Sequence, residues 1–201
     1  GSGIMYENKV ITEPIWKTWV IKTTDPILTP EQCKIVMDAG RSLKPEKALV
    51  GMGNAEKNYD TEKRVTTISW IPPKKLPHLY DTLDTFIGKA NRNHFGFDDI
   101  RITESAQYTE YPTGGFYGWH MDTDIVGHHQ PPVRKISMTL LLNHESEFEG
   151  GDLEILDEGK TAPITQGNAI CFASFLRHRV KPVTKGIRKS LVVWFGGTPF
   201  R

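Results

Sequence analysis

Short apolar runs dominate the chain from about residue 100 onward, and Gly, Pro, Asn and Asp separate them. Runs of this kind, rich in β-branched and aromatic side chains, are typical of β-strands, and the separators are typical of the loops between strands. Because no helical pattern alternates with them, as it would in a parallel α/β sheet, they favour a fold with two β-sheets. Over the whole chain, the expected strands are residues 15–21, 65–71, 102–108, 136–142, 153–155, 168–172 and 189–195.

Two helices are predicted ahead of this region. The first begins after Thr29, which can act as the N-cap, because Pro30 suits the first helical position and Gln32 completes a capping box; Gly40 is a stop signal for it. The second covers about residues 77–93, where apolar residues at helical spacing build one face. Those residues are Leu79, Leu83, Phe86, Ile87 and Ala90. We expect this face to pack on a sheet, so that the helices back the strands.

The length of 201 residues suits one well-buried core and is marginal for two. We therefore expect a single domain of mainly β (α+β) class over residues 5–201. In it, about residues 5–100 give helical support and about residues 100–197 form the core. Residues 1–4 are set aside, because Gly1, Ser2 and Gly3 are typical of an expression remnant and Met5 can serve as the natural start.

Composition limits the partners and the compartment. Lys and Arg together number 25 against 24 Asp and Glu, so the composition does not support nonspecific electrostatic binding to nucleic acid. The two cysteines, Cys33 and Cys171, cannot make a disulfide scaffold, and Cys171 lies in an apolar run typical of a buried thiol. No stretch is apolar enough to span a bilayer, and no targeting signal is visible. We expect a soluble cytoplasmic protein, of phage or bacterial source.

The segment Trp119-His120-Met121-Asp122 is the first candidate for chemistry. The side chains of residues two apart on an extended chain point the same way, so His120 and Asp122 can coordinate one metal ion together. A His-x-Asp pair is common without a metal, and the pattern alone is weak. Asp124 is an alternative ligand, which the two-residue spacing disfavours. The neighbouring Tyr117 and Trp119 are expected to serve core packing rather than substrate contact.

His178 lies 58 residues after His120 and follows an expected strand and a short turn. Two imidazoles and a carboxylate on a β scaffold match the facial triad of non-haem Fe(II) oxygenases, which leaves metal positions open for other ligands. Alternatively, His178 is a loop histidine whose hydrogen bonds are made within the protein and which binds no metal. The other histidines lack a comparable pattern and are expected to have no metal role: His78, His94, His128, His129 and His144.

Arg188 stands at the start of the apolar strand 189–195. Burying an arginine there is costly unless an anion meets it, and the guanidinium fork suits a carboxylate. Pairing with an acidic side chain is the structural alternative for an isolated arginine. The order His-x-Asp, distal His and then Arg makes the combined interpretation much stronger than its parts.

At this point the sequence resembles a family, the Fe(II)- and 2-oxoglutarate-dependent dioxygenases, in their prolyl 4-hydroxylase-like branch. The resemblance covers about residues 100–197 and follows four blocks in the same order. They are the segment from Tyr111 to Asp122, the Leu-Asn landmark at Leu140–Asn143, the segment Glu149-Gly150-Gly151-Asp152-Leu153, and the segment from His178 to Arg188. The Gly150-Gly151 pair itself is expected to serve a tight turn and no chemistry.

The resemblance implies a double-stranded β-helix (jelly roll) with His120, Asp122 and His178 holding Fe(II) at one mouth. It implies that Arg188 pairs with the far carboxylate of 2-oxoglutarate and that Tyr111 hydrogen-bonds this cosubstrate. Ascorbate is a further expected reductant. Arg134 and Trp194 match positions that border the substrate proline in relatives. The chain departs from some relatives in having Leu141 where they place a tyrosine, so another hydroxyl, from Ser190, Ser137 or Thr139, is expected to assist Arg188.

The implied reaction is the hydroxylation of an unactivated C–H bond with conversion of 2-oxoglutarate to succinate and CO2. A prolyl residue in a protein or peptide is the leading substrate, and a lysyl side chain, a free amino acid or a nucleobase are the alternatives. Two polar loops, residues 51–61 and 125–133, are candidate lids over a peptide. Two other classes compete: a non-catalytic jelly-roll binding module, although all four motif residues are present, and a zinc hydrolase, which leaves Arg188 unexplained.

Overall fold

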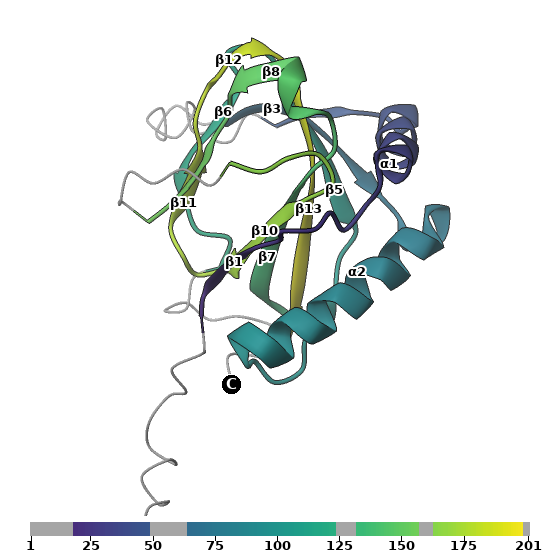
Figure 1. The fold of residues 1–201 in the computed structure, drawn as a ribbon, viewed down its shortest axis with the longest axis vertical. Coiled ribbons are helices and arrows are strands. Elements are labelled where there is room, and N and C mark those ends of the chain that lie inside the picture. The colour runs from purple at the N-terminus through teal and green to yellow at the C-terminus, as the bar shows by residue number, and fades with distance from the viewer. Residues whose placement is uncertain (1–17, 49–63, 124–131, 157–162, 199–201) are drawn as a thin grey trace, which may run out of the picture.

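The structure, a computed structural model, describes residues 18–48, 64–123, 132–156 and 163–198. Its strands form a curled antiparallel β region, and two helices lie on one side of it (Figure 1). The helices are α1 (Pro30–Ser42) and α2 (Pro77–Ala90). The strands are β1 (Val20–Lys22), β2 (Glu46–Ala48), β3 (Arg64–Ile71), β4 (Arg101–Ile102), β5 (Ala106–Tyr111), β6 (Phe116–His120), β7 (Val133–Leu141), β8 (Phe148–Gly150), β9 (Leu153–Ile155), β10 (Ala169–Ala173), β11 (His178–Val180), β12 (Val183–Gly186) and β13 (Arg188–Gly197).

The strands pair in the order β1-β10-β7-β13-β5-β3-β6-β11-β9, with β2 added to β3 and β4 added to β13. Strands β12 and β8 make a separate ribbon, and every pair is antiparallel. The path curls back on itself beyond β3, which gives the expected jelly roll backed by helices near the N-terminal end (Figure 1). The core strands β7 and β13 lie side by side at its centre.

Helix α1 starts as the sequence predicts. Thr29 accepts a hydrogen bond from the backbone N–H of Gln32, and the Gln32 side chain accepts one from the backbone N–H of Thr29. The predicted stop at Gly40 was wrong, because the helix continues to Ser42. Gly40 serves close packing instead: a Cβ there would lie 2.4 Å from Cγ of Tyr108. The glycine lets the helix press against strand β5.

Side chains alternate along β13 and define the two faces of the large sheet. Leu191, Val193 and Phe195 are fully buried on the helix-covered face, where they join the main apolar core. Val192 and Trp194 line a cavity on the opposite face. Beside these β13 residues, the main core includes residues of both helices and of strands β5, β7 and β10: Val36, Leu83, Ile87, Ala106, Tyr108, Ile136, Met138, Leu140 and Cys171. A smaller cluster lies on the inner face: Tyr111, Leu153, Ile170, Phe172, Val180 and Val183.

Several strands differ from the predicted runs. The run 102–108 divides into β4 and β5, and the run 15–21 is described only from residue 18. Short strands β2, β6, β8, β11 and β12 were not among the predicted runs. The expected lid segment 51–61 and most of 125–133, with His128 and His129, lie outside the described residues.

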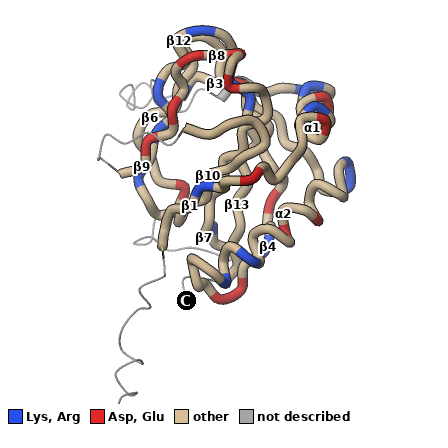
Figure 2. Tube along the Cα trace, viewed as in Figure 1, with Lys and Arg blue, Asp and Glu red and all other residues tan. Residues whose placement is uncertain are grey.

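Other expectations concern the surface and the thiols. Acidic and basic side chains are interspersed over the trace in the view of Figure 2, in keeping with the balanced charge. Cys33 and Cys171 are both buried and free. Within the described ranges, none of the helices has the length and apolar character needed to cross a bilayer.

Candidate metal centre

His120, Asp122 and His178 come together at the end of the β6–β11 pair. His120 ends β6, His178 begins β11, and the two are register partners. Oδ1 of Asp122 lies 3.4 Å from Nε2 of His120 and 3.5 Å from Nε2 of His178. One ligand atom from each residue can be chosen so that all lie within 4.8 Å of one another. Among the described residues, this is the group of His, Cys, Asp or Glu side chains that can hold a metal ion.

A β-bulge shapes this corner. His178 pairs with His120, but Val180 pairs with Tyr117, so β6 carries one residue more than β11 over this stretch. The extra residue brings Tyr117, which is three positions before His120, to the same face as His120. The two rings stack with centroids 3.6 Å apart and an angle of 10° between their planes. Tyr117 packs against the smaller apolar cluster, as expected, but it also lines the cavity in front of the triad, because alternation along a regular strand does not hold through a bulge.

The backbone fixes both imidazoles for metal binding. Nδ1 of His120 lies 2.6 Å from the carbonyl oxygen of Gly118, and Nδ1 of His178 lies 3.0 Å from that of Leu176. An Nδ1–H that donates to a carbonyl turns Nε2 toward Asp122, where this nitrogen can donate to the carboxylate when protonated or bind a metal ion when deprotonated. Burial lowers the pKa of His120, although the hydrogen bond to Asp122 opposes this shift. Two imidazoles and one carboxylate with open positions beside them fit Fe(II).

The second oxygen of Asp122 is held by two donors. Ser137 Oγ donates to Oδ2 at 2.6 Å, and the indole Nε1 of Trp194 donates to it at 3.0 Å. Burial by itself raises the pKa of Asp122, but hydrogen bonds from His120 and His178 and their charges hold it well below its usual value. The carboxylate is thus ionised, and Oδ1 is turned toward the imidazoles.

Arg188 begins β13 and has only 3% of its surface exposed. Its NH1 donates to Ser190 Oγ at 3.0 Å, and its guanidinium carbon lies 5.6 Å from the centre of the Tyr111 ring. Burial lowers the pKa of Arg188, while Tyr111 and Asp152 oppose this shift. Arg188 forms no ion pair with any carboxylate among the described residues. Gly151 makes room for it, since a Cβ at that glycine would lie 2.9 Å from Cδ of Arg188.

Arg134 and Trp194 form one rim of the site. The guanidinium carbon of Arg134 lies 3.7 Å from the centre of the Trp194 ring, and both residues line the cavity in front of the triad. Glu104 holds Arg134 through two hydrogen bonds of 2.7 Å. A second register shift, where Phe195 pairs with Ile136 but Gly196 pairs with Arg134, brings Arg134 to the cavity face. Of the expected site residues, the triad, Tyr111, Arg134 and Trp194 line this cavity, whereas Arg188 lines a neighbouring one that shares Leu153 with it.

Comparison with known proteins identifies this region. Residues 106–196 match the family model of the 2OG-Fe(II) oxygenase superfamily. This segment belongs to that superfamily. It is 40% identical over 87 residues to a PKHD-type hydroxylase of Idiomarina loihiensis, a match that covers 42% of this chain and 38% of the relative. A PKHD-type hydroxylase of Acidovorax ebreus is 34% identical over 95 residues, covering 44% of this chain and 41% of the relative. The chain thus spans about two fifths of the length of these curated relatives.

Solved structures share the fold of the oxygenase segment and of the region before it. A viral collagen prolyl hydroxylase from Paramecium Bursaria Chlorella virus-1 superposes with a TM-score of 0.70 and 18% identity, covering 90% of this chain and 97% of that chain. A prolyl-4-hydroxylase from Pseudomonas putida gives a TM-score of 0.64 and 21% identity, covering 89% and 92%. At these identities the likeness shows the jelly-roll fold.

The triad opens into a cavity of about 280 Å³ lined by residues of several strands. Besides the triad and its rim, the cavity wall contains Arg64, Gln107 and Tyr117, which were not predicted as site residues. Arg64 could have been suspected from its place at the start of an apolar strand, the signal that identified Arg188. Trp119 lies outside this wall and was wrongly assigned to core packing. The guanidinium groups of Arg177 and Arg179 lie 4.6 and 4.8 Å from its ring.

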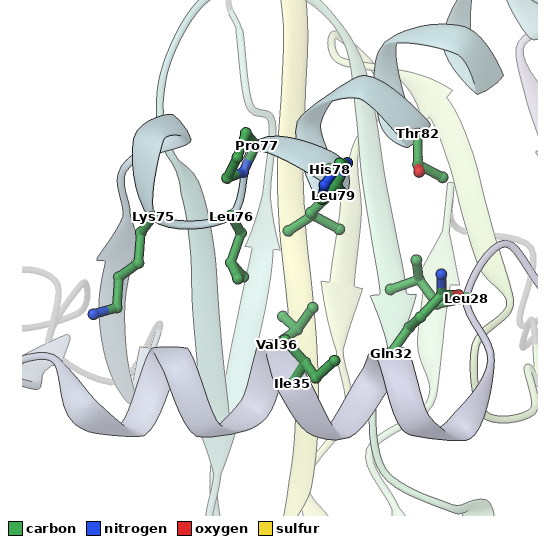
Figure 3. A pocket seen from close by; sticks show the side chains of 10 residues that line it. All are labelled: Leu28, Gln32, Ile35, Val36, Lys75, Leu76, Pro77, His78, Leu79 and Thr82. Atoms are coloured by element: carbon green, nitrogen blue, oxygen red, sulfur yellow. The ribbon is translucent and has the colours of Figure 1, made fainter.

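A second cavity, of about 420 Å³, has a mainly apolar wall, unlike the cavity in front of the triad. Figure 3 shows that its side chains come from α1 and Leu28 before it, and from the first turns of α2 and the two residues before them, so it lies between the two helices. His78 is its one ionisable ring, beside mainly apolar neighbours such as Leu28, Val36 and Leu79. No group of metal ligands faces it within the described residues. His94 and His144 are also outside the triad, and Asp124 lies outside the described residues.

Proposed function

We propose that this protein is an Fe(II)- and 2-oxoglutarate-dependent hydroxylase that acts on a prolyl residue of a protein or peptide and releases succinate and CO2. One observation carries the proposal. The triad of His120, Asp122 and His178 faces a cavity whose wall includes Tyr111 and the stacked pair of Arg134 and Trp194. Behind Tyr111 lies Arg188, a buried arginine that lines a neighbouring cavity and has no ion pair among the described residues.

His120, Asp122 and His178 would hold the iron, which supplies oxygen activation and C–H oxidation when it is bound. The protein's own contribution is to fix the three ligands. Backbone carbonyls orient the two imidazoles, and Ser137 and Trp194 orient the carboxylate. Such outer partners commonly matter nearly as much as the ligands themselves. Ascorbate would act as the reductant that keeps the iron ferrous.

Arg188 and Tyr111 would bind 2-oxoglutarate. A buried guanidinium with no ion pair among the described residues is suited to the far carboxylate of this cosubstrate, because a charge-assisted pair offsets the cost of burial. Ser190, which accepts from Arg188 at 3.0 Å, is the hydroxyl best placed to assist in the absence of a tyrosine at Leu141. Tyr111 is buried next to Arg188 and adjoins the triad across the cavity.

Arg134, Trp194 and Tyr117 would bind the substrate. They present one cation and two aromatic rings around the mouth of the cavity, which suits the ring of a proline and the backbone carbonyls beside it. Trp70 and Met121, which are 38% and 52% exposed, extend this rim with apolar surface. A peptide substrate is also in keeping with a fold relative, a Trichoplax adhaerens prolyl hydroxylase in complex with a hypoxia-inducible-factor peptide fragment (TM-score 0.63, 18% identity, covering 89% of this chain and 83% of that chain).

The test begins without oxygen. Fe(II) and 2-oxoglutarate are added anaerobically to the wild-type protein and to its His178→Ala and Arg188→Ala variants, and the visible spectrum is recorded for the weak metal-to-ligand band of the chelate. We expect the band in the wild type, its loss in His178→Ala, and a much higher 2-oxoglutarate concentration for half-saturation in Arg188→Ala. Arg92→Ala, on the exposed end of the helical region, is the matched arginine control.

Oxygen and a set of proline-containing peptides are then supplied, and the products are followed by mass spectrometry. Peptides that gain one oxygen atom, with equivalent formation of succinate, support prolyl hydroxylation. A folded protein that shows no band with Fe(II) and 2-oxoglutarate rules out the dioxygenase. A normal band with oxidation of lysine-containing peptides or free amino acids instead would keep the chemistry and replace the substrate.

A further inference from the structure

Three arginines lie around the triad, and two of them have assigned partners. Arg134 is neutralised by Glu104 through two hydrogen bonds. Arg188 is the proposed partner of the cosubstrate. The third, Arg64, begins β3 and has only 9% of its surface exposed. It lines the same cavity as His120, Asp122 and His178.

Among the described residues, the contacts of Arg64 are with uncharged side chains. Its Nε donates to Thr66 Oγ1 at 3.1 Å, and its NH2 donates to Gln107 Oε1 at 2.8 Å. Its guanidinium carbon lies 4.5 Å from the centre of the Tyr117 ring. No carboxylate in the described ranges forms an ion pair with it. A buried guanidinium without an anion is costly, and neutral acceptors satisfy only part of its donor capacity.

The neutral contacts hold Arg64 in a defined orientation toward the site. Gln107 is itself fixed, because its Oε1 also accepts from Thr109 Oγ1 at 3.0 Å. The Tyr117 ring contacts both groups: it stacks on the imidazole of His120, and its centre lies 4.5 Å from the guanidinium carbon of Arg64. Arg64 therefore sits one aromatic ring away from the triad, within reach of a group next to a reacting carbon.

We propose that Arg64 is a specificity residue that binds a carboxylate of the substrate, next to the residue that is hydroxylated. The inference rests on the proposed hydroxylase function and narrows its substrate class. The carboxylate can be an Asp or Glu side chain beside the target residue, or the terminal carboxylate of a short peptide or amino acid. Either source offers the planar, bidentate acceptor that a guanidinium prefers.

Two matched pairs of ligands test the inference. The first pair is acetyl-proline and acetyl-prolinamide, and the second is acetyl-Pro-Glu-amide and acetyl-Pro-Gln-amide. Their binding to the anaerobic protein with Fe(II) and 2-oxoglutarate is measured by calorimetry. In at least one pair we expect the acid to bind about tenfold or more tightly than its amide, as a charge-assisted hydrogen bond should give. The first pair reports a terminal carboxylate and the second an acidic side chain.

Substitution of the arginine completes the test. Arg64→Gln should remove the preference for the acid while the affinity for the amide changes little, and Arg92→Gln should leave both unchanged. Arg64→Lys, which keeps a positive charge, should retain part of the preference, and thermal unfolding checks that each variant folds. Equal affinities within both pairs, no binding of any of the four ligands, or a preference that survives in Arg64→Gln would overturn the inference.

The two proposals fail in different ways. If the hydroxylase function is wrong, the spectral band with Fe(II) and 2-oxoglutarate is absent whatever the ligand. If only the role of Arg64 is wrong, the band and its dependence on Arg188 remain, and acids and amides bind alike.

Discussion

Strand β13 presents two different surfaces to the rest of the molecule. On the face toward the helices, Leu191, Val193 and Phe195 are fully buried among apolar neighbours from α1, α2 and the adjacent strands. On the other face, Arg188 and Trp194 adjoin cavities and make polar contacts, with Ser190 and with Asp122. The same strand therefore contributes apolar packing on one side and polar chemistry on the other.

This contrast between the two faces of β13 separates the residues that stabilise the fold from the residues that form the site. The helix-covered face has the larger continuous apolar core, so it should supply most of the hydrophobic stabilisation. The cavity face has a smaller apolar cluster and keeps several polar groups buried with open space before them. Changes on the first face should alter unfolding and spare the site, and changes on the second should do the reverse.

The largest expected effect is on the helix-covered face. Leu83 of α2 is fully buried in the main core. Leu83→Ala should lower the free energy of unfolding by about 2–5 kcal/mol, because it removes buried methyl groups and leaves a cavity. Urea unfolding followed by circular dichroism measures this change. Fe(II) affinity at temperatures where the variant is folded should stay within experimental error of the wild type.

The exposed helical substitution Asp81→Ala is the control for Leu83→Ala. A loss of Fe(II) affinity in Leu83→Ala that matches its loss of stability would show that the two faces are coupled and that the contrast is too simple.

An intermediate effect is expected at Ser137, on the cavity face. Ser137→Ala removes the 2.6 Å hydrogen bond to Oδ2 of Asp122 and leaves that of Trp194. Fe(II) affinity, measured by anaerobic titration, should fall by about tenfold, since outer-shell partners of metal ligands typically contribute that much or more. Ser42→Ala, at an exposed serine of α1, should have no effect on it. Unchanged affinity together with a large loss of stability would assign Ser137 to packing alone.

The smallest expected effect concerns pH. Burial raises the pKa of the Cys33 thiol from 9.0 to about 11. Between these two values the unfolded chain loses the thiol proton and the folded chain keeps it, so deprotonation favours unfolding. The contribution of this thiol to stability is thus complete below pH 9.0 and is lost as the pH rises toward 11, with a slope of at most about 1.4 kcal/mol per pH unit.

Urea unfolding of the metal-free protein across that pH window measures the effect of Cys33. The wild type should lose stability more steeply with rising pH than Cys33→Ala, whatever the offset between the two curves. Parallel curves would mean that the thiol is not protected by the helix-covered core.

The sequence predicted the parts of the site that lie on regular strands. Arg188 and Trp194 are an even number of residues apart on β13, so simple alternation places them on one face. His120 and Asp122 are close in sequence. His178 was predicted because it follows them, and precedes Arg188, in the order that the triad pattern requires. The capping box at Thr29 identified the start of α1 because its signal is local.

The remaining parts depend on long-range pairing that local patterns do not contain. Tyr117 reaches the face of His120, and Arg134 reaches the face of Ser137, at odd spacings that bulges make possible. Strands β8, β11 and β12 are short and are defined by their partners rather than by an apolar run. Gly40 looked like a helix stop because the sequence does not reveal that Tyr108 packs against it.

The indole of Trp194 touches two parts of the site at once. Its ring stacks with the guanidinium of Arg134 at the rim, and its N–H donates a hydrogen bond to the carboxylate of Asp122. A ligand that shifts this rigid group must also change the support of the carboxylate, so occupancy of the rim and occupancy of the triad are thermodynamically linked. Linkage is reciprocal: whatever factor the ion adds to the affinity of a rim ligand, that ligand adds to the affinity of the ion.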